Sequence, residues 1–361
     1  MSIKKSFTTN KKMQILLILI LSFLLIGQGC TLGQGSKKIP PDAGVFKSFD
    51  KGENWVKKNM ILSVQGIGDM SNVNTLKLIF DPADNQAIYL LSAENGLFYT
   101  YDGSDSWFQP KQINTGRIED LVVDPDNKCI IYSTFGNKIL KSVDCSRSWQ
   151  EIYVDTRPQQ IITSLAIDFY NHLSIYAGLQ TGEIIKSEDG GISWTTINRF
   201  DNKIVQIAIY PHDSRIIYVV TQNRGILKSA DKGKTWQEIN EELRKYPTSL
   251  DIKQLIFNES KPDSFIIAAK YGLIKTNDGG DSWQPINLIT PPSSADIYAL
   301  AINPEDENEI YYTTASTFYK TVDGGQNWIT RKLPTTSAAS YLLIDPESPN
   351  IIYMGARRLG R

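Results

Sequence analysis

All seven tryptophans of this chain stand at the end of the same kind of stretch. Each stretch begins with serine or threonine, has an aspartate two positions later, and usually has a glycine two positions after that. They are SFDKGENW (48–55), TYDGSDSW (100–107), SVDCSRSW (142–149), SEDGGISW (187–194), SADKGKTW (229–236), TNDGGDSW (276–283) and TVDGGQNW (321–328). Their aspartates follow one another after 52, 42, 45, 42, 47 and 45 residues, which indicates a repeated structural unit.

The rest of each unit has the composition of short strands. Two apolar runs, such as LAINPED and IIYVVT, precede each stretch, a third leads into it, and a fourth such as WTTIN follows it. These runs are rich in Ile, Val, Tyr and Thr and are bounded by Gly, Pro, Asn and Asp. No segment after residue 40 sustains a helical period. The pattern predicts an all-β chain built as a β-propeller of four-stranded antiparallel blades.

We interpret each stretch as the hairpin turn between the third and fourth strands of a blade. The aspartate and the Ser/Thr hydroxyl accept N–H groups that a tight turn leaves unpaired, the glycine takes a positive φ, and the tryptophan packs against the next blade. The alternative is a ligand site lined by these residues, but seven near-equal copies favour a scaffold. The residues given this role are Asp50, Trp55, Asp102, Trp107, Asp144, Trp149, Asp189, Gly191, Trp194, Asp231, Gly233, Trp236, Asp278, Gly280, Trp283, Asp323, Gly325 and Trp328.

The two ends of the repeat array are each incomplete. Before the first stretch, AGVFKS (43–48) supplies only a third strand, and NWVKKN (54–59) supplies the fourth. The C-terminal segment 339–361 has a first and a second strand and no stretch after them. We therefore predict seven blades, one of them assembled from both termini, which hides sheet edges that would otherwise be open.

The first 29 residues do not belong to the repeats. Four lysines precede an apolar run from Ile15 to Ile26, which is short for a membrane span of about 20 residues and typical of a signal peptide. Cys30 follows Gly29 as in a lipoprotein cleavage site, although Gly27 departs from that pattern; simple cleavage and an uncleaved anchor are the alternatives. We expect a signal peptide (1–29), a lipidated Cys30 with a flexible tether (30–40) and a propeller (41–361), exported and membrane-anchored, facing outward.

The net charge, the other two cysteines and the two histidines limit the kinds of partner and cofactor that the chain is expected to bind. Removal of four lysines with residues 1–29 changes the net charge from −1 to −5, which argues against a nucleic-acid partner. Cys129 and Cys145 fall in one repeat, nearly opposite each other, so either a disulfide or two free thiols is expected. His172 and His212 lie in loops, and no cluster has the spacing of a zinc site, so we expect neither a metal nor a cofactor.

Two sets of residues are candidates for binding or chemistry. Arginines gather in the loops expected on the face opposite the hairpin turns, where they form either an anion-attracting surface or ordinary solvated charge: Arg117, Arg157, Arg199, Arg224, Arg244, Arg357, Arg358 and Arg361. The third residues of the inner strands should ring the central channel: Lys77, Asp120, Ser164, Gln206, Gln254, Ala299 and Tyr341. Glycosidases use two opposed carboxylates, and Asp120 with the adjacent Glu119 is the least unsuitable pair.

The repeated stretch resembles the Asp-box, or BNR repeat, over essentially everything after residue 40. Four copies fit fully and SFDKGENW nearly so, whereas Ser104 and Ser146 replace the usual glycine. Among Asp-box proteins, sialidases place an arginine motif before the first box, but the first arginine here is Arg117. Xyloglucan-cleaving hydrolases use two propellers, and sortilin ectodomains have a larger ring.

A single exported seven-bladed ring looks most like the photosystem II assembly-factor propellers, which act by binding proteins. The resemblance implies a non-enzymatic, monomeric propeller that binds an envelope protein through the face opposite the boxes. The alternative is a glycoside hydrolase or a carbohydrate-binding propeller that uses the same face.

Overall fold

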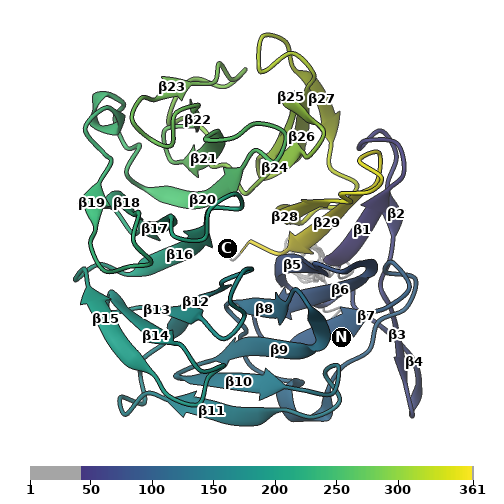
Figure 1. Cartoon of the computed structure of the whole chain (residues 1–361). Coiled ribbons are helices and arrows are strands. Elements are labelled where there is room, and N and C mark those ends of the chain that lie inside the picture. Colours follow the sequence, from purple (N-terminus) through teal and green to yellow (C-terminus); the bar gives the residue numbers. More distant parts are fainter. Residues whose placement is uncertain (1–41, 360–361) are drawn as a thin grey trace, which may run out of the picture. The chain divides into compact units, whose positions relative to one another are not determined.

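The computed structural model describes residues 42–359, which form a ring of seven antiparallel sheets (Figure 1). The predicted all-β, seven-bladed propeller is confirmed. Six sheets have four strands, and in the seventh the outermost position is reduced to a bridge between Tyr99 and Phe108. The segments called signal peptide and tether lie outside the described residues.

The strands follow the chain around the ring, from the inside of each blade to its outside. The blades are β5 (Thr75–Asp81), β6 (Asp84–Ser92), β7 (Leu97–Thr100); β8 (Leu121–Asp124), β9 (Asn127–Phe135), β10 (Lys138–Ser142), β11 (Gln150–Val154); β12 (Ile162–Ile167), β13 (Ile175–Leu179), β14 (Glu183–Ser187), β15 (Thr195–Arg199); β16 (Ile204–Ile209), β17 (Ile217–Thr221), β18 (Gly225–Ser229), β19 (Gln237–Glu238); β20 (Ile252–Phe257), β21 (Phe265–Ala269), β22 (Leu273–Thr276), β23 (Gln284–Pro285); and β24 (Ala299–Asn303), β25 (Asp306–Thr313), β26 (Thr317–Thr321), β27 (Ile329–Lys332). Two short 3-10 helices, η1 (Lys111–Ile113) and η2 (Leu243–Lys245), lie in connections between blades.

Both ends of the described chain build the seventh blade, here named the closing blade. Its strand order is β2 (Val56–Lys57), β1 (Gly44–Ser48), β29 (Ile352–Arg357) and β28 (Ala338–Ile344). β1 pairs antiparallel with β29, so that Phe46 lies opposite Met354. The predicted closure by the two termini is therefore confirmed.

The Asp-box turns have the hydrogen bonds that their composition predicts. In the box of Asp189, the hydroxyl of Ser187 donates to the carboxylate (2.8 Å) and accepts the N–H of Gly191 (2.8 Å). Ser193 donates to the same carboxylate from its backbone (2.9 Å) and from its hydroxyl (2.5 Å). Gly190 and Gly191 have φ of 70° and 95°, values that a side chain opposes.

Every box is also tied to the loop between the first and second strands of its own blade. In each case the residue after the aspartate donates its N–H to a carbonyl in that loop or near the start of the second strand. The pairs are Lys51–Asn350, Gly103–Gln86, Cys145–Cys129, Gly190–Leu173, Lys232–Arg215, Gly279–Asp263 and Gly324–Asn308. Boxes and first-to-second loops therefore share one face of the ring, here named the box face.

The hydrophobic core is divided among the junctions between blades. Seven clusters of buried residues occur in the described chain, and each draws on two adjacent blades. The box tryptophans take part: Trp107, Trp149 and Trp283 are buried, while the other four are half-buried. A Cβ at Gly191 would lie 2.5 Å from Cδ1 of Ile152 in the preceding blade, so the box packs against its neighbour too closely for a side chain.

One hairpin lies in the connection between the closing blade and the β5–β7 blade. Within residues 59–74 the chain forms a hairpin of β3 (Met60–Ser63) and β4 (Gly66–Asp69). The turn has only two residues, Val64 and Gln65, because Ser63 is paired with Gly66. Strand β4 alternates glycine with Ile67 and Asp69, a composition too poor in strand-forming residues to identify it as a strand.

Candidate functional site

The ring encloses a channel of about 870 Å³ lined by the inner strands. At the box-face end the lining includes prolines that follow the inner strands: Pro82, Pro211, Pro304 and Pro346. At the opposite end it includes cations at the starts of the inner strands or beside them: Arg117, Lys203, Lys253 and Arg357. Glu259 also lines the box-face end and Glu119 the opposite end. The mouth opposite the boxes therefore has an excess of cations, and it is here named the cationic mouth.

The predicted channel ring is built by irregular pairing of the inner strands. In five of the seven inner strands the register shifts by one residue directly before the ring position. The ring residues after these shifts are Lys77, Ser164, Gln206, Gln254 and Tyr341. An extra residue of this kind re-aims the side chain that follows it, and here it lets ring residues reach the next blade.

Asp120 is the centre of the most connected part of the ring. Its carboxylate pairs with Lys77 Nζ (2.5 Å) and accepts the hydroxyl of Ser164 (3.2 Å) and the N–H of Leu165 (3.0 Å). Burial alone would lower the pKa of Lys77, but the adjacent Asp120 carboxylate outweighs burial and leaves that pKa raised. Asp120 thus joins three blades, β5–β7, β8–β11 and β12–β15.

The ring continues with hydrogen bonds from other side chains to the next inner strand. Gln206 donates to the carbonyl of Leu255 (3.0 Å) and accepts the N–H of the same residue (2.9 Å). Gln254 accepts the N–H of Leu300 (3.2 Å). Ala299 has no polar side-chain atom to continue the series. Of the seven predicted ring residues, Ser164 and Ala299 are buried and do not belong to the channel lining. The bonds between blades could not be predicted from the sequence because the register shifts have no clear sequence signal.

The two candidate acids both line the channel, and each is engaged in an ion pair. Asp120 is buried and engaged as above, and Glu119 forms an ion pair with Arg117 (2.5 Å). A general acid and its partner in glycoside hydrolysis must face a sugar across a gap. The engaged Asp120 carboxylate is instead part of the scaffold that holds the blades together.

Four of the predicted surface arginines are neutralised by carboxylates. Arg157 contacts Asp155 (2.8 Å) and Glu183 (2.8 Å), and these contacts raise the pKa of its guanidinium. Arg117 is paired with Glu119, and Arg224 with Glu238 (2.8 Å). Arg244, noted with them in the sequence, shares Glu238 with Arg224 (3.0 Å).

The other predicted arginines within the described residues form no ion pair. No ion pair within residues 42–359 uses Arg199, Arg357 or Arg358. Arg357 lines the channel, and its Nε is buried without a hydrogen-bond partner in the described chain. Arg358 donates from its side chain to the carbonyl of Asn72 (3.0 Å). Arg361 lies outside the described residues.

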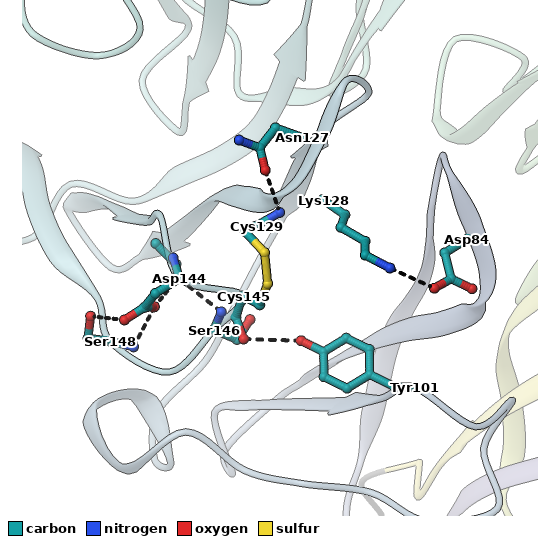
Figure 2. Close-up of a disulfide and its surroundings, with 10 residues drawn as sticks. Asp84, Tyr101, Asn127, Lys128, Cys129, Asp144, Cys145, Ser146 and Ser148 are labelled. Atoms are coloured by element: carbon teal, nitrogen blue, oxygen red, sulfur yellow. Dashed lines mark hydrogen bonds and ion pairs between the residues drawn. A yellow bond between two sulfur atoms is a disulfide. The ribbon is translucent and has the colours of Figure 1, made fainter.

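Cys129 and Cys145 are joined by a disulfide on the box face (Figure 2). Tyr101 of the preceding blade donates to the carbonyl of Cys145 (3.1 Å), and Lys128 pairs with Asp84 of that blade (3.2 Å) (Figure 2). The bridge thus lies next to a junction between blades.

Within residues 42–359 no group of three or more His, Cys, Asp or Glu side chains is placed to hold a metal ion. Over the same range no helix has both the length and the apolar character needed to cross a membrane.

The fold and the boxes define a seven-bladed β-propeller of the Asp-box type. A model of the family described as "Sortilin, neurotensin receptor 3" matches residues 182–287, a minority of the chain. No curated protein matches the sequence.

Solved structures of similar fold belong to proteins that are described with different functions. A GH74 xyloglucanase from Xanthomonas campestris has a TM-score of 0.65 at 16% identity, over 79% of this chain and 51% of that one. YCF48 bound to D1 peptide has a TM-score of 0.59 at 16% identity, over 80% of this chain and 94% of that one. The extracellular domain of a B. thetaiotaomicron protein described as a hybrid two-component system has a TM-score of 0.60 at 15% identity, over 83% and 38%. The chain thus spans about half of the xyloglucanase and nearly all of YCF48.

Proposed function

We propose that this protein is a non-enzymatic, exported propeller that is tethered to a membrane at Cys30 and binds a protein through the face opposite the boxes. The observation that carries the proposal is the cationic mouth of the channel. Arg357 and Lys203 line this mouth, and no carboxylate within the described chain pairs with either. Charge of one sign at a concave mouth attracts a partner of the opposite sign, so the partner should present carboxylates.

Two further points support binding over hydrolysis. Asp120 holds blades together and Glu119 is paired with Arg117, so each candidate carboxylate already has a structural partner. Among the structures of similar fold, the one covered almost completely by this chain is YCF48, whose structure contains a bound D1 peptide. The propeller here is proposed to use the same mode of action on a partner of its own cell envelope.

The test is a capture experiment with envelope extract. The wild-type chain is compared with a variant in which Arg357→Glu and Arg358→Glu reverse the charge of the cationic mouth. The matched control is Arg215→Glu on the box face, where Arg215 is exposed and paired with Asp213 (2.7 Å). We expect Arg357→Glu/Arg358→Glu to lose specific partners that Arg215→Glu retains. An identical set of partners for all three proteins would contradict the proposal.

Hydrolysis is tested separately with a panel of plant and bacterial polysaccharides. We expect no cleavage by the wild-type chain. Cleavage that disappears in Glu119→Gln would replace the binding proposal by the glycoside hydrolase alternative.

A further inference from the structure

The β3–β4 hairpin extends one blade of the propeller outward beyond its fourth strand. Tyr99 in β7 and Phe108 exchange backbone hydrogen bonds (2.9 and 2.8 Å). On the other side of that segment, Trp107 donates to the carbonyl of Met60 (2.8 Å) and accepts the N–H of Leu62 (2.8 Å). The order is therefore β5, β6, β7, the Trp107–Phe108 segment, β3 and β4, and β4 forms the outer rim (Figure 1).

The outer side of β4 carries backbone groups without partners. Hydrogen-bonded and non-bonded pairs alternate along an antiparallel hairpin. Met60 and Leu62 use their backbone groups toward Trp107, so their partners Asp69 and Ile67 are in the non-bonded pairs of the hairpin. The N–H and C=O of Ile67 consequently point away from β3, and no hydrogen bond within residues 42–359 uses them.

This edge lacks the features that usually protect an edge strand. Proteins place lysines, prolines or bulges on such edges to prevent pairing with another chain. Residues 59–69, which include the whole hairpin, contain no lysine and no proline, and the one charged residue is Asp69 at the end of β4. The side chain of Ile67 is 77% exposed, and it stands between two glycines, Gly66 and Gly68, which leave the backbone open to close approach.

We propose that this edge pairs with the same edge of a second copy of the chain, through β4 strands related by a two-fold axis at Ile67. In that antiparallel register the N–H of each Ile67 donates to the carbonyl of the other, and the two side chains pack together. Asp69 then lies opposite Gln65 of the second copy, so that no like charges meet. A second copy of β4 therefore fits this edge because its own side chains match when the two strands are paired. An unrelated strand is a poorer candidate, because β4 has no pocket or charge that would select its side chains.

The contact is small compared with a stable dimer interface, so we infer a weak, reversible dimer of this kind. This proposal departs from the monomer expected from the sequence, because the open edge of the hairpin has no recognisable sequence signal. The inference is independent of the proposed function, since β4 lies on the outer rim and the proposed binding surface surrounds the channel.

Disulfide trapping tests the register directly. Opposed residues in a bonded antiparallel pair have Cα atoms about 5.5 Å apart, which a disulfide can bridge. The full chain with Cys30→Ser and the Cys129–Cys145 bridge intact receives either Ile67→Cys or Val64→Cys. Val64 is the matched control because it is 95% exposed at the hairpin turn but lies off the β4 edge. We expect a covalent dimer with Ile67→Cys to form at least tenfold faster than with Val64→Cys; equal rates would overturn the proposal.

Charge substitution distinguishes strand pairing from a lipid contact. In sedimentation velocity at rising protein concentration, we expect Ile67→Lys to abolish self-association and Val64→Lys to retain it, with unchanged melting temperatures for both. Insertion of the hairpin tip into lipid would depend on both side chains. We therefore also measure flotation with vesicles of phosphatidylethanolamine and phosphatidylglycerol. If both substitutions abolish flotation and neither changes self-association, the hairpin contacts a membrane and the proposal is overturned.

Discussion

The backbone N–H of Cys145 donates to the carbonyl of Cys129 (3.3 Å), and the side chains of the same two residues form a disulfide. The other six blades have the hydrogen bond at this position without a covalent bond. The β8–β11 blade therefore carries a cross-link at a contact that every blade already makes. Its neighbour across the junction is the β5–β7 blade, which has the least regular fourth strand and carries the hairpin.

Reduction of this disulfide should destabilise the protein without changing its fold. The bridge closes a loop with a sequence separation of 16 residues, for which loss of the cross-link costs about 3 kcal/mol. We expect a reductant to lower the free energy of unfolding, measured in urea, by about that amount. Cys129→Ser/Cys145→Ser should be equally destabilised and insensitive to reductant. Insensitivity of the wild type would show that the bridge contributes nothing.

The two departures from the Asp-box pattern are predicted to be sites of strain. Ser104 and Ser146 have φ of 78° and 66°, and the hydroxyl of each is buried without a hydrogen-bond partner in the described chain. Because a left-handed conformation costs a non-glycine residue about 1 kcal/mol, Ser104→Gly and Ser146→Gly should each stabilise the fold by about that amount. The reverse change, Gly191→Ser, should destabilise it. Thermal unfolding of the three variants checks the sign, and destabilisation by Ser104→Gly would refute the strain.

Stability should fall steeply below pH 4. Side-chain and backbone hydrogen bonds from the residue four places later lower the pKa of Asp189, Asp231 and Asp323 to about 2. A lowered folded-state pKa stabilises the protein above the unfolded value near 4, and this contribution is lost as pH falls toward 2. Urea midpoints from pH 6 to pH 2 measure the effect. The triple change to asparagine should flatten the decline, and an identical slope would contradict the assignment.

Asp120 should matter for stability rather than for chemistry. Asp120→Ala leaves the partly exposed Lys77 without its counter-charge and the buried N–H of Leu165 without its acceptor, a loss of about 1–3 kcal/mol. Asp281→Ala, at an exposed position of a box, is the matched control and should have little effect. Equal unfolding midpoints for the two variants would remove the structural role of Asp120.

Deletion of 335–361 should abolish cooperative unfolding. The deletion removes β28 and β29, so that β1 loses its only inner partner and two core clusters lose members. Differential scanning calorimetry of the truncated and complete chains provides the measurement. A truncated chain that melts within a few degrees of the complete one would contradict the closure.

The repeat of Asp, Gly and Trp was sufficient to predict the fold and the number of blades. In each turn the Asp accepts backbone N–H groups, the Gly takes a positive φ, and the Trp packs against the next blade. The split of one blade between the termini was also predictable, since strands were missing at both ends. The hairpin was not, because Gly66–Asp69 has no strand-forming pattern and is stabilised by backbone bonds to Trp107 through β3.

The site could be predicted only in outline. The spacing of the inner strands predicted that Lys77 and Asp120 lie at the channel. Their ion pair depends on a register shift before Lys77, which has no recognisable sequence signal. Likewise, sequence placed the arginines on one face but could not separate Arg357, which lines the channel, from Arg157, which carboxylates neutralise. This difference depends on which arginines have a carboxylate within ion-pair distance in the folded chain.

The pairing of β1 with β29 has a consequence for the order of biosynthesis. The first strand of the ring to leave the ribosome, β1, finds its inner partner only in β29, after the other six blades have been made. Contacts between such distant segments form slowly because a long loop must close first. The ring can therefore close only once β29 has been synthesised, and until then apolar blade faces are open to aggregation or to chaperones.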